Sequence, residues 1–318
     1  MKLGIISDLR NPQHPRFHRP WVQHYHEFLD LMVQLEDLGF EEVVFPEHHF
    51  EPDGYLPNPI PMMTAVAIKT KKMLVGADLF RLPDWHPVRL AEDVAMVDIL
   101  SNGRVLFKAG AGGPCPPISA GLGWNPRRQL SRSAETLHII KQCWTEEVFD
   151  WEGQHYHLKG VRAMPKPVQQ PHPSIFMPAQ TPKAMDRNAR EGYGATQGAG
   201  RWTFEREHLG WWKHWHQEWE AALARYGRTA HECPVSAFFP LSAPTTPNGH
   251  GPHTRTGFCM SPTPTPGWRS ALSCRRRPRS YPTGTRCSSR PTKWCSSCEA
   301  SWKAQRQTTS SSGTPSQA

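Results

Sequence analysis

The last quarter of the chain, residues 245–318, has almost none of the branched aliphatic side chains from which a hydrophobic core is built. It contains no valine, no isoleucine and a single leucine, Leu272, among 13 serines and nine prolines. Such a segment cannot bury enough apolar surface to offset the entropy lost when its backbone becomes ordered. We therefore predict a low-complexity tail at 245–318, either a natural disordered segment or the product of a shifted reading frame. The shifted frame is favoured, because a GC-rich gene read out of frame tends to give a mixture of Arg, Ser, Pro, Thr and Cys.

The first 244 residues lack an excess of positive charge, although the whole chain of 318 residues has a formal net charge of +9. Residues 245–318 hold 11 of the 37 basic side chains but only one of the 28 acidic ones, Glu299. The remainder therefore carries 26 basic and 27 acidic side chains, a net charge of −1. This balance argues against a nucleic-acid-binding groove in the folded part.

Cysteines and long apolar runs are scarce in the same part of the chain. Only Cys115, Cys143 and Cys233 lie in it, too few for a disulfide framework and suited to a reducing compartment. No run approaches the ~18 apolar residues of a membrane span. Asp8 and Arg10 interrupt the apolar start before it reaches the length of a signal peptide. These features predict a cytoplasmic protein that binds neither membranes nor nucleic acids.

The first 241 residues contain a regular alternation of short β-rich runs and helical patterns, which is typical of a parallel sheet wound with helices. The predicted strands cover residues 2–8, 42–46, 73–79, 104–109, 174–179, 193–198 and 234–241. They predict an α/β fold, a TIM-type (β/α)8 barrel, in one domain at 1–244. Because only seven strands are recognised, we expect the barrel to lack its eighth strand and to leave the edges of the first and seventh strands unpaired.

Two motifs place ionisable side chains at the ends of predicted strands, where a barrel enzyme keeps its chemistry. The first, EHHF, follows the apolar run Val43–Phe45, so Glu47 and His48 should emerge just beyond a buried strand. The second, HPVRLAEDV, begins at His86, and a third segment, LSNGRVLF, leads into the next strand. A neutral imidazole can accept or release a proton near pH 7, so His48 is the leading candidate for a general base. A structural histidine at the strand end is the alternative.

In this order, the segments EHHF, LPDWHPVRLAEDVAMVD and LSNGRVLF resemble the flavin-dependent, bacterial luciferase-like monooxygenase family, and the likeness runs from Met1 to about Leu241. The resemblance implies an enzyme that takes reduced FMN from a separate flavin reductase. It would insert one oxygen atom of O2 into a small organic substrate through a flavin C4a-hydroperoxide. A homodimer is also implied. Two alternatives remain: an oxidoreductase that uses the deazaflavin F420 by hydride transfer, or an inactive flavin-binding relative.

The resemblance also assigns catalytic roles to residues of this chain. It places the catalytic histidine at His48 and sets His86 close to the cofactor, with an ordinary loop histidine as the alternative for His86. Glu47 is expected at the cofactor, where it would hold an imidazole or a backbone amide in place without reacting; a purely structural ion pair is the alternative. Two His-x-His pairs elsewhere give no convincing metal site, since one pair lies on a predicted helix where alternate residues point apart. No metal is therefore predicted.

The cofactor contacts that the resemblance implies include the end of the third predicted strand. The backbone of Ala77, Asp78 and Leu79 would pass under the isoalloxazine ring. A cis peptide bond is expected between Asp78 and Leu79, although such a bond is rare away from proline.

Phosphate binding needs backbone amides or hydroxyls and usually a cation, and two turns offer such groups. One is the glycine-rich turn that begins at Gly110, in which Ala111 stands where the family often has an arginine. That substitution weakens the expected grip on phosphate. The other turn holds Ala179, Gln180 and Thr181, which match the family's second phosphate contact more closely and place a hydroxyl at the start of a helix.

Overall fold

The described part of the chain contains a ring of eight strands, seven of which run parallel and alternate with helices. The computed structural model describes residues 2–15, 18–197, 206–240 and 257–261, all within the unit Met1–Pro266. The ring strands are β1 (Lys2–Ile6), β2 (Glu42–Phe45), β3 (Leu74–Ala77), β5 (Val105–Gly110), β8 (Ser174–Pro178), β9 (Gly194–Gln197), β10 (Val235–Pro240) and β11 (Gly257–Ser261). They pair in the order β3-β2-β1-β11-β10-β9-β8-β5, and β5 pairs with β3 to close the ring.

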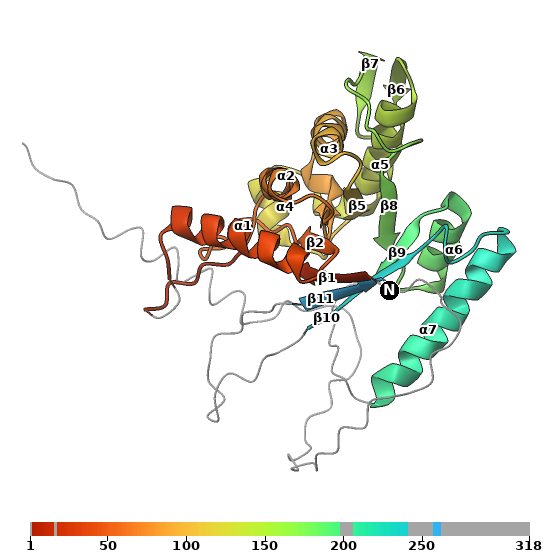
Figure 1. The fold of residues 1–318 in the computed structure, drawn as a ribbon. Helices are drawn as coiled ribbons and strands as arrows, with labels where there is room; N and C mark the ends of the chain where they lie inside the picture. The colour runs from red at the N-terminus through yellow and green to blue at the C-terminus, as the bar shows by residue number, and fades with distance from the viewer. Residues whose placement is uncertain (1, 16–17, 198–205, 241–256, 262–318) are drawn as a thin grey trace, which may run out of the picture. The chain divides into compact units, whose positions relative to one another are not determined.

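Helices alternate with the parallel strands (Figure 1). They are α1 (Trp21–Asp37), α2 (Pro59–Lys69), α3 (Pro87–Ser101), α4 (Pro116–Gly121), α5 (Gln129–Thr145), α6 (Pro182–Glu191) and α7 (Arg206–Arg225), with 3-10 turns η1 (Leu82–Asp84) and η2 (Pro126–Arg128). Proline begins α2, α3 and α6, where its fixed φ suits the first helical turn. A two-residue strand, β4 (Phe80–Arg81), pairs with the end of β5, and β6 (Phe149–Glu152) forms a hairpin with β7 (His157–Val161). None of the described helices is long and apolar enough to cross a membrane.

The seven predicted strands are all present, and the predicted TIM-type barrel is confirmed up to β10. The expectation of unpaired edges on β1 and β10 is wrong. Both edges pair with β11, which runs antiparallel to each of them, with Leu3 opposite Met260 and Phe239 opposite Phe258. Strand pairing uses backbone N–H and C=O groups, so it does not require the aliphatic side chains that residues 245–318 lack. The remainder of that segment lies outside the described residues.

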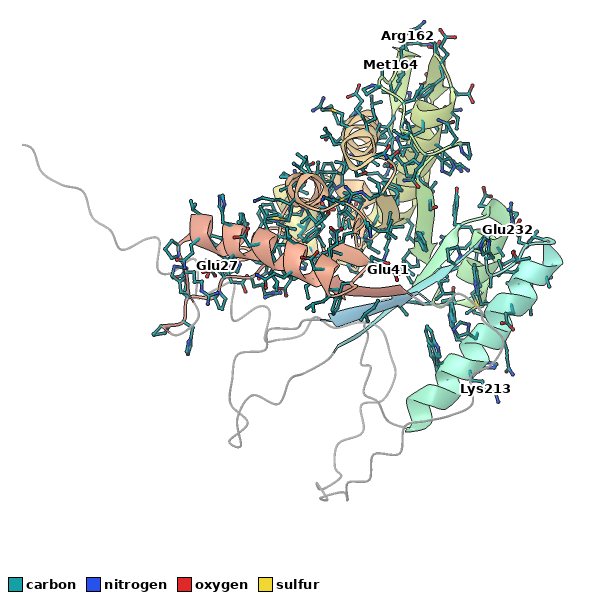
Figure 2. All side chains as sticks on the ribbon, viewed as in Figure 1. Glu27, Glu41, Arg162, Met164, Lys213 and Glu232 are labelled. Atoms are coloured by element: carbon teal, nitrogen blue, oxygen red, sulfur yellow. The ribbon has the colours of Figure 1, made fainter. Side chains whose placement is uncertain are left out.

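The main core lies between the ring and its covering helices. Val43, Val44 and Phe45 of β2 are fully buried, as expected for a parallel strand covered on both faces. Figure 2 shows side chains filling the space between the strands and α2, α3 and α5. A second cluster forms where α7 packs on α6 and the neighbouring strands, and it contains Trp215 and Trp219.

Arg104, from the LSNGR segment, ties together the ends of two helices and the start of a strand. Its guanidinium donates to the carbonyl oxygens of Ala67 (2.6 Å), Met73 (2.7 Å) and Ser101 (2.6 Å). These carbonyls lie at the end of α2, just before β3 and at the end of α3. Arg104 of the LSNGRVLF segment therefore has a structural role.

Charged side chains cross the interior of the ring. Lys108 on β5 is fully buried, and its ammonium pairs with the carboxylate of Glu42 on β2. The same ammonium donates to Ser236 Oγ on β10 at 2.7 Å. Neither β2 nor β10 is next to β5 in the ring, so these contacts join strands that do not pair with one another.

Replacing Lys108 by methionine is expected to destabilise the protein by about 3–5 kcal/mol, because Glu42 then faces no ammonium in a buried position. The free energy of unfolding can be measured by urea titration. The double variant K108M/E42L, which removes both charges, should recover much of the loss. Equal stability of the single variant and the wild type would contradict the burial of this pair.

Candidate active site

The predicted site residues lie at the carboxyl ends of four strands. Glu47 follows β2, Asp78 follows β3, Gly110 ends β5 and Ala179 follows β8. The four strands are consecutive in the closed ring. The carboxyl ends of parallel strands lie at the same end of a barrel, which we call its mouth. These residues therefore line one sector of the mouth.

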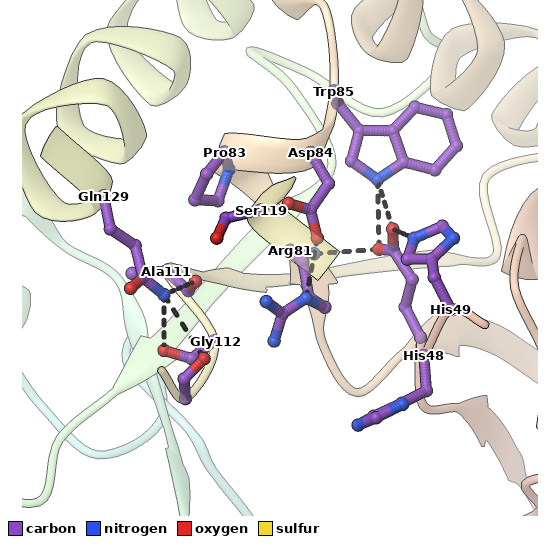
Figure 3. Close-up of polar contacts among 12 residues, drawn as sticks. His48, His49, Arg81, Pro83, Asp84, Trp85, Ala111, Gly112, Ser119 and Gln129 are labelled. Atoms are coloured by element: carbon purple, nitrogen blue, oxygen red, sulfur yellow. Dashed lines mark hydrogen bonds and ion pairs between the residues drawn. The ribbon is translucent and has the colours of Figure 1, made fainter. Parts of the chain in front are cut away.

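The side chain of Glu47 lies within a buried hydrogen-bond network (Figure 3) and is only 1% exposed. Its carboxylate accepts the backbone N–H of Arg81 at 2.8 Å. The indole Nε1 of Trp85 donates to the two carboxylate oxygens, at 2.9 and 3.0 Å. His49 Nε2 lies 3.1 Å from one of them. Glu47 therefore holds an imidazole and a backbone amide, as expected.

Burial raises the pKa of the Glu47 carboxyl, although the hydrogen bonds from His49, Trp85 and the Arg81 amide act in the opposite direction. The carboxyl thus keeps its proton at a higher pH than an exposed glutamate does. Protein hydrogen-bond donors surround the Glu47 carboxylate. Direct contact between Glu47 and a cofactor stays a prediction.

His48 presents a neutral imidazole beside this network. Its ring stacks on Tyr55 with centroids 4.9 Å apart and planes 7° apart. Nδ1 lies 3.3 Å from Glu51 Oε1, but without the geometry of a hydrogen bond. Burial lowers the pKa of His48; Glu51 opposes this effect, and Arg81 and Arg10 reinforce it. The ring is therefore a proton acceptor near pH 7.

His86 lies at the N-cap of α3, exposed, and its ring meets the edge of Tyr156 with centroids 5.8 Å apart. Partial burial of the ring lowers the pKa of His86, and the charge of Arg132 lowers it further. Among the described residues, no hydrogen bond or ion pair joins His86 to His48. A catalytic role for His86 stays a prediction.

The peptide bond between Asp78 and Leu79 is cis, as predicted. Asp78 Oδ1 accepts a hydrogen bond from Thr196 Oγ1 of β9 at 3.3 Å. Although other atoms of the residue keep some exposure, Oδ2 is buried and has no hydrogen-bond partner. Burial raises the pKa of Asp78 to about 6, against the opposing charge of Lys108. The contacts of Ala77 and Leu79 with a cofactor stay predictions.

The glycine-rich turn after β5 is held by Gln129, the first residue of α5. Its side-chain Nε2 donates to the carbonyl oxygens of Ala111 (2.6 Å), Gly112 (3.1 Å) and Gly113 (3.4 Å) (Figure 3). The three carbonyls thus share one donor. Gln129 fixes the turn from the side of the α5 N-terminus.

The turn after β8 has one buried residue and two residues exposed to solvent. Ala179 is fully buried; its amide donates to a backbone carbonyl of β9 at 3.3 Å, and its carbonyl accepts Trp215 Nε1 at 2.8 Å. Gln180 and Thr181 are exposed. Thr181 caps α6, because its hydroxyl accepts the amide of Ala184 at 3.3 Å. The N-terminus of α6 is therefore well defined and open to solvent.

Residues 1–248 match the family model described as luciferase-like monooxygenase. The chain belongs to this family. An F420-dependent glucose-6-phosphate dehydrogenase from Microbacterium testaceum is 30% identical over 183 residues, which cover 54% of this chain and 53% of that protein. The oxygenase component of a flavin-dependent trigonelline monooxygenase from Acinetobacter baylyi is 28% identical over 177 residues, or 54% of this chain and 47% of that protein.

Among solved structures, the monooxygenase RslO1 from Streptomyces bottropensis superposes on the luciferase-like chain with a TM-score of 0.63 and 26% identity. The match covers 72% of this chain and 68% of that one. The chain spans about half the length of the curated relatives it matches.

Three residues at the mouth of the barrel were not predicted from the sequence: Arg81, Asp84 and Gln129. Arg81 Nε donates to Asp84 Oδ2 at 2.7 Å, and both side chains are almost fully buried. Trp124 Nε1 donates to the other oxygen of Asp84 at 2.9 Å. The charges in the segment FRLPD, three residues apart at the end of a buried strand, could have indicated the ion pair; no sequence signal marks Gln129.

Glu47, His49 and Asp84 bring possible metal-ligand atoms within 4.8 Å of one another. However, Glu47 already accepts the indole N–H of Trp85, and Asp84 is paired with the guanidinium of Arg81. A metal cation would have to displace or repel that buried guanidinium. We therefore assign the three residues to the hydrogen-bond network.

Replacing Asp78 by asparagine is expected to change how stability depends on pH. The folded-state pKa is about 6 and the ordinary value is 3.8. Between these values the folded state binds more protons than the unfolded state, so Asp78 lowers stability as the pH rises from about 4 to about 6. Asparagine does not ionise, so D78N should gain stability relative to the wild type over this range.

Urea midpoints at intervals from about pH 4 to about pH 7 test this expectation. Asp30→Asn, at an exposed position, is the control for removal of one carboxylate. A difference between D78N and wild type that stays constant with pH would show that Asp78 titrates normally.

Proposed function

We propose that the chain is the oxygenase of a two-component flavin-dependent monooxygenase. It takes reduced FMN from a separate flavin reductase and uses O2 to oxygenate a small organic substrate. The observation that carries this proposal is the position of the His48 imidazole just after β2, stacked on Tyr55 and in the same sector of the mouth as Asp78 and Gly110. The flavin-dependent oxygenase component among the relatives supports it.

The residues at the mouth fit a flavin phosphate ester. A Cβ on Gly110 would lie 3.1 Å from Leu79 Cδ2 and 3.2 Å from Pro178, so a larger residue would fill the space between them. The N-terminus of α6, with exposed Thr181 and Lys183, offers backbone amides, a hydroxyl and a cation for the phosphate. When bound, reduced FMN would supply the electrons that activate O2.

The chain's own residues hold and move protons. Nδ1 of His48 is buried beside Glu51, which leaves Nε2 to accept or return a proton at the ligand. Stacking on Tyr55 fixes the plane of the ring. Glu47 acts as a positioning residue, because its carboxylate orients His49 and the backbone at Arg81 and does not itself face solvent.

An F420-dependent oxidoreductase is the second candidate, favoured by the 30% identical F420-dependent dehydrogenase. Titration of the purified chain with photoreduced FMN and with reduced F420, followed by mixing with O2, separates the two. The proposal expects tighter binding of reduced FMN and oxygen uptake that depends on a substrate. Binding of F420 alone would favour hydride transfer, and no affinity for either cofactor would favour an inactive relative.

We also propose a homodimer formed through the C-terminal half of α3. Met96, Ile99 and Leu100 on this helix are 52%, 40% and 51% exposed. Apolar side chains grouped on one helix are typical of a surface that a partner covers. Light scattering of the purified chain should give twice the monomer mass, and a triple replacement by Ser, Gln and Gln should give the monomer.

Replacing His48 by alanine is expected to lower turnover with reduced FMN by ~10²-fold or more while leaving FMN affinity nearly unchanged, because the imidazole moves a proton and does not anchor the cofactor. Single-turnover oxygen uptake and flavin titration give the two values. His157→Ala, an exposed histidine on β7, is the matched control. Unchanged turnover would leave His48 a structural residue.

A further inference from the structure

The buried hydrogen-bond network of Glu47 does not hold the imidazole of His48. His49 points toward that network, whereas His48 points away from it (Figure 3). Nδ1 of His48 is buried without a hydrogen-bond partner, and the side chain as a whole is 32% exposed. A partly exposed ring without hydrogen bonds needs another contact to keep one orientation. The stacked ring of Tyr55 is that contact.

Tyr55 is itself fixed by two charged side chains. The guanidinium carbon of Arg10 lies 4.0 Å from the centre of the Tyr55 ring, which is the geometry of a cation–π contact. The backbone N–H of Tyr55 donates to Asp53 Oδ1 at 3.2 Å. The other carboxylate oxygen of Asp53 accepts a hydrogen bond from Nη1 of Arg10 at 2.9 Å. Asp53 therefore joins the backbone of Tyr55 to the cation that lies over its ring.

Arg10 is held in turn by the segment that follows β1. Its Nε lies 3.2 Å from Asp8 Oδ2, and its backbone N–H donates to Asp8 Oδ1 at 3.3 Å. Backbone hydrogen bonds join this segment to the loop after β2. The N–H of Leu56 donates to the carbonyl of Asp8 at 3.1 Å, and the N–H of His48 donates to the carbonyl of Leu56 at 3.0 Å. A guanidinium with carboxylate partners on two sides keeps its plane, so it gives Tyr55 a fixed contact.

We propose that Arg10 is a positioning residue for His48, and that together with Asp53 it holds Tyr55 against the imidazole. The inference rests on the proposed function, in which His48 moves a proton, and adds the segment after β1 to that function. An imidazole kept in one plane presents Nε2 in a constant direction, as proton transfer to or from a bound ligand requires. Arg10 does not touch the ligand in this role.

The charge of Arg10 also favours the neutral form of the imidazole. Burial is the largest cause of the lowered pKa of His48, and Glu51, from the same loop, opposes it. The charges of Arg81, Arg10 and His49 lower this pKa further. Arg10 follows β1 and Arg81 lies on β4, so two elements outside the histidine's own loop bring cations near the ring. Loss of the Arg10 cation should therefore raise the pKa of His48.

The first test follows the ring protons of His48 by NMR in the purified full chain without a cofactor. The signal that is missing in His48→Ala identifies this residue, and Tyr55→Ala gives the position of the signal without the stack. Arg10→Gln should move the signal toward that unstacked position, whereas Arg10→Lys keeps the cation and should leave it close to the wild type. Arg162→Gln breaks an exposed ion pair beyond β7 and should leave the signal unchanged.

The second test is single-turnover oxygen uptake with reduced FMN. Arg10→Gln should lower turnover roughly threefold or more while FMN affinity stays nearly unchanged, because the imidazole loses its fixed direction. The acid limb of the pH profile should move to higher pH, since Asp8 and Asp53 lose their cation and their negative charge then favours the imidazolium. A purely structural role for Arg10 would lower activity without moving this limb, and that result would contradict the inference.

If Arg10→Gln does not fold, the double variant R10Q/D53N removes the cation together with one of its carboxylates and keeps an acceptor for the Tyr55 amide. An unchanged His48 signal in the variant that folds would overturn the inference, as would an equal shift in Arg162→Gln. A wild type that binds no reduced FMN, in a protein whose NMR signals shift as expected, would contradict the proposed function and still support the contact of Arg10 and Tyr55 with His48.

Discussion

The buried carboxylate of Glu47 is the contact on which the mouth of the barrel depends. It lies at the end of β2, and it fixes the backbone of Arg81 on β4 and the indole of Trp85 beyond η1. A carboxylate removed from water requires such donors, and loss of one donor leaves it unsatisfied. Glu47 holds Arg81 by its backbone amide, and the guanidinium of the same residue pairs with Asp84. Glu47 thus fixes the positions of neighbouring groups at the end of β2.

The sequence was sufficient for the parallel strands and insufficient for the contacts between them. Buried parallel strands are short apolar runs, so all seven could be recognised without knowledge of their partners. The two-residue β4 is too short for such a pattern, and the five-residue β11 lies in a segment whose composition argued against a strand. The buried pair Lys108–Glu42 joins residues 66 apart in the chain. It depends on which strands lie near each other in the ring without pairing, which no local pattern encodes.

The same division applies to the site. The position of His48 shortly after β2 could be predicted from the EHHF motif, and the family resemblance implied the cis bond between Asp78 and Leu79. The partners of His48 could not, since the stacked Tyr55 comes from the loop that follows the motif. Gln129 reaches the glycine-rich turn from 17 residues away, as the first residue of a helix with no distinguishing sequence. Local sequence thus indicates which residues reach the mouth, and tertiary packing determines what they contact there.

The reversed direction of β11 has a consequence for how this barrel can change in evolution. Seven strands bring side chains to the mouth at their carboxyl ends, but β11 begins there, opposite the end of β10. In this sector an insertion before the strand, and not after it, would therefore reach the mouth. In the other seven strands, insertions reach the mouth when they follow the carboxyl end of the strand.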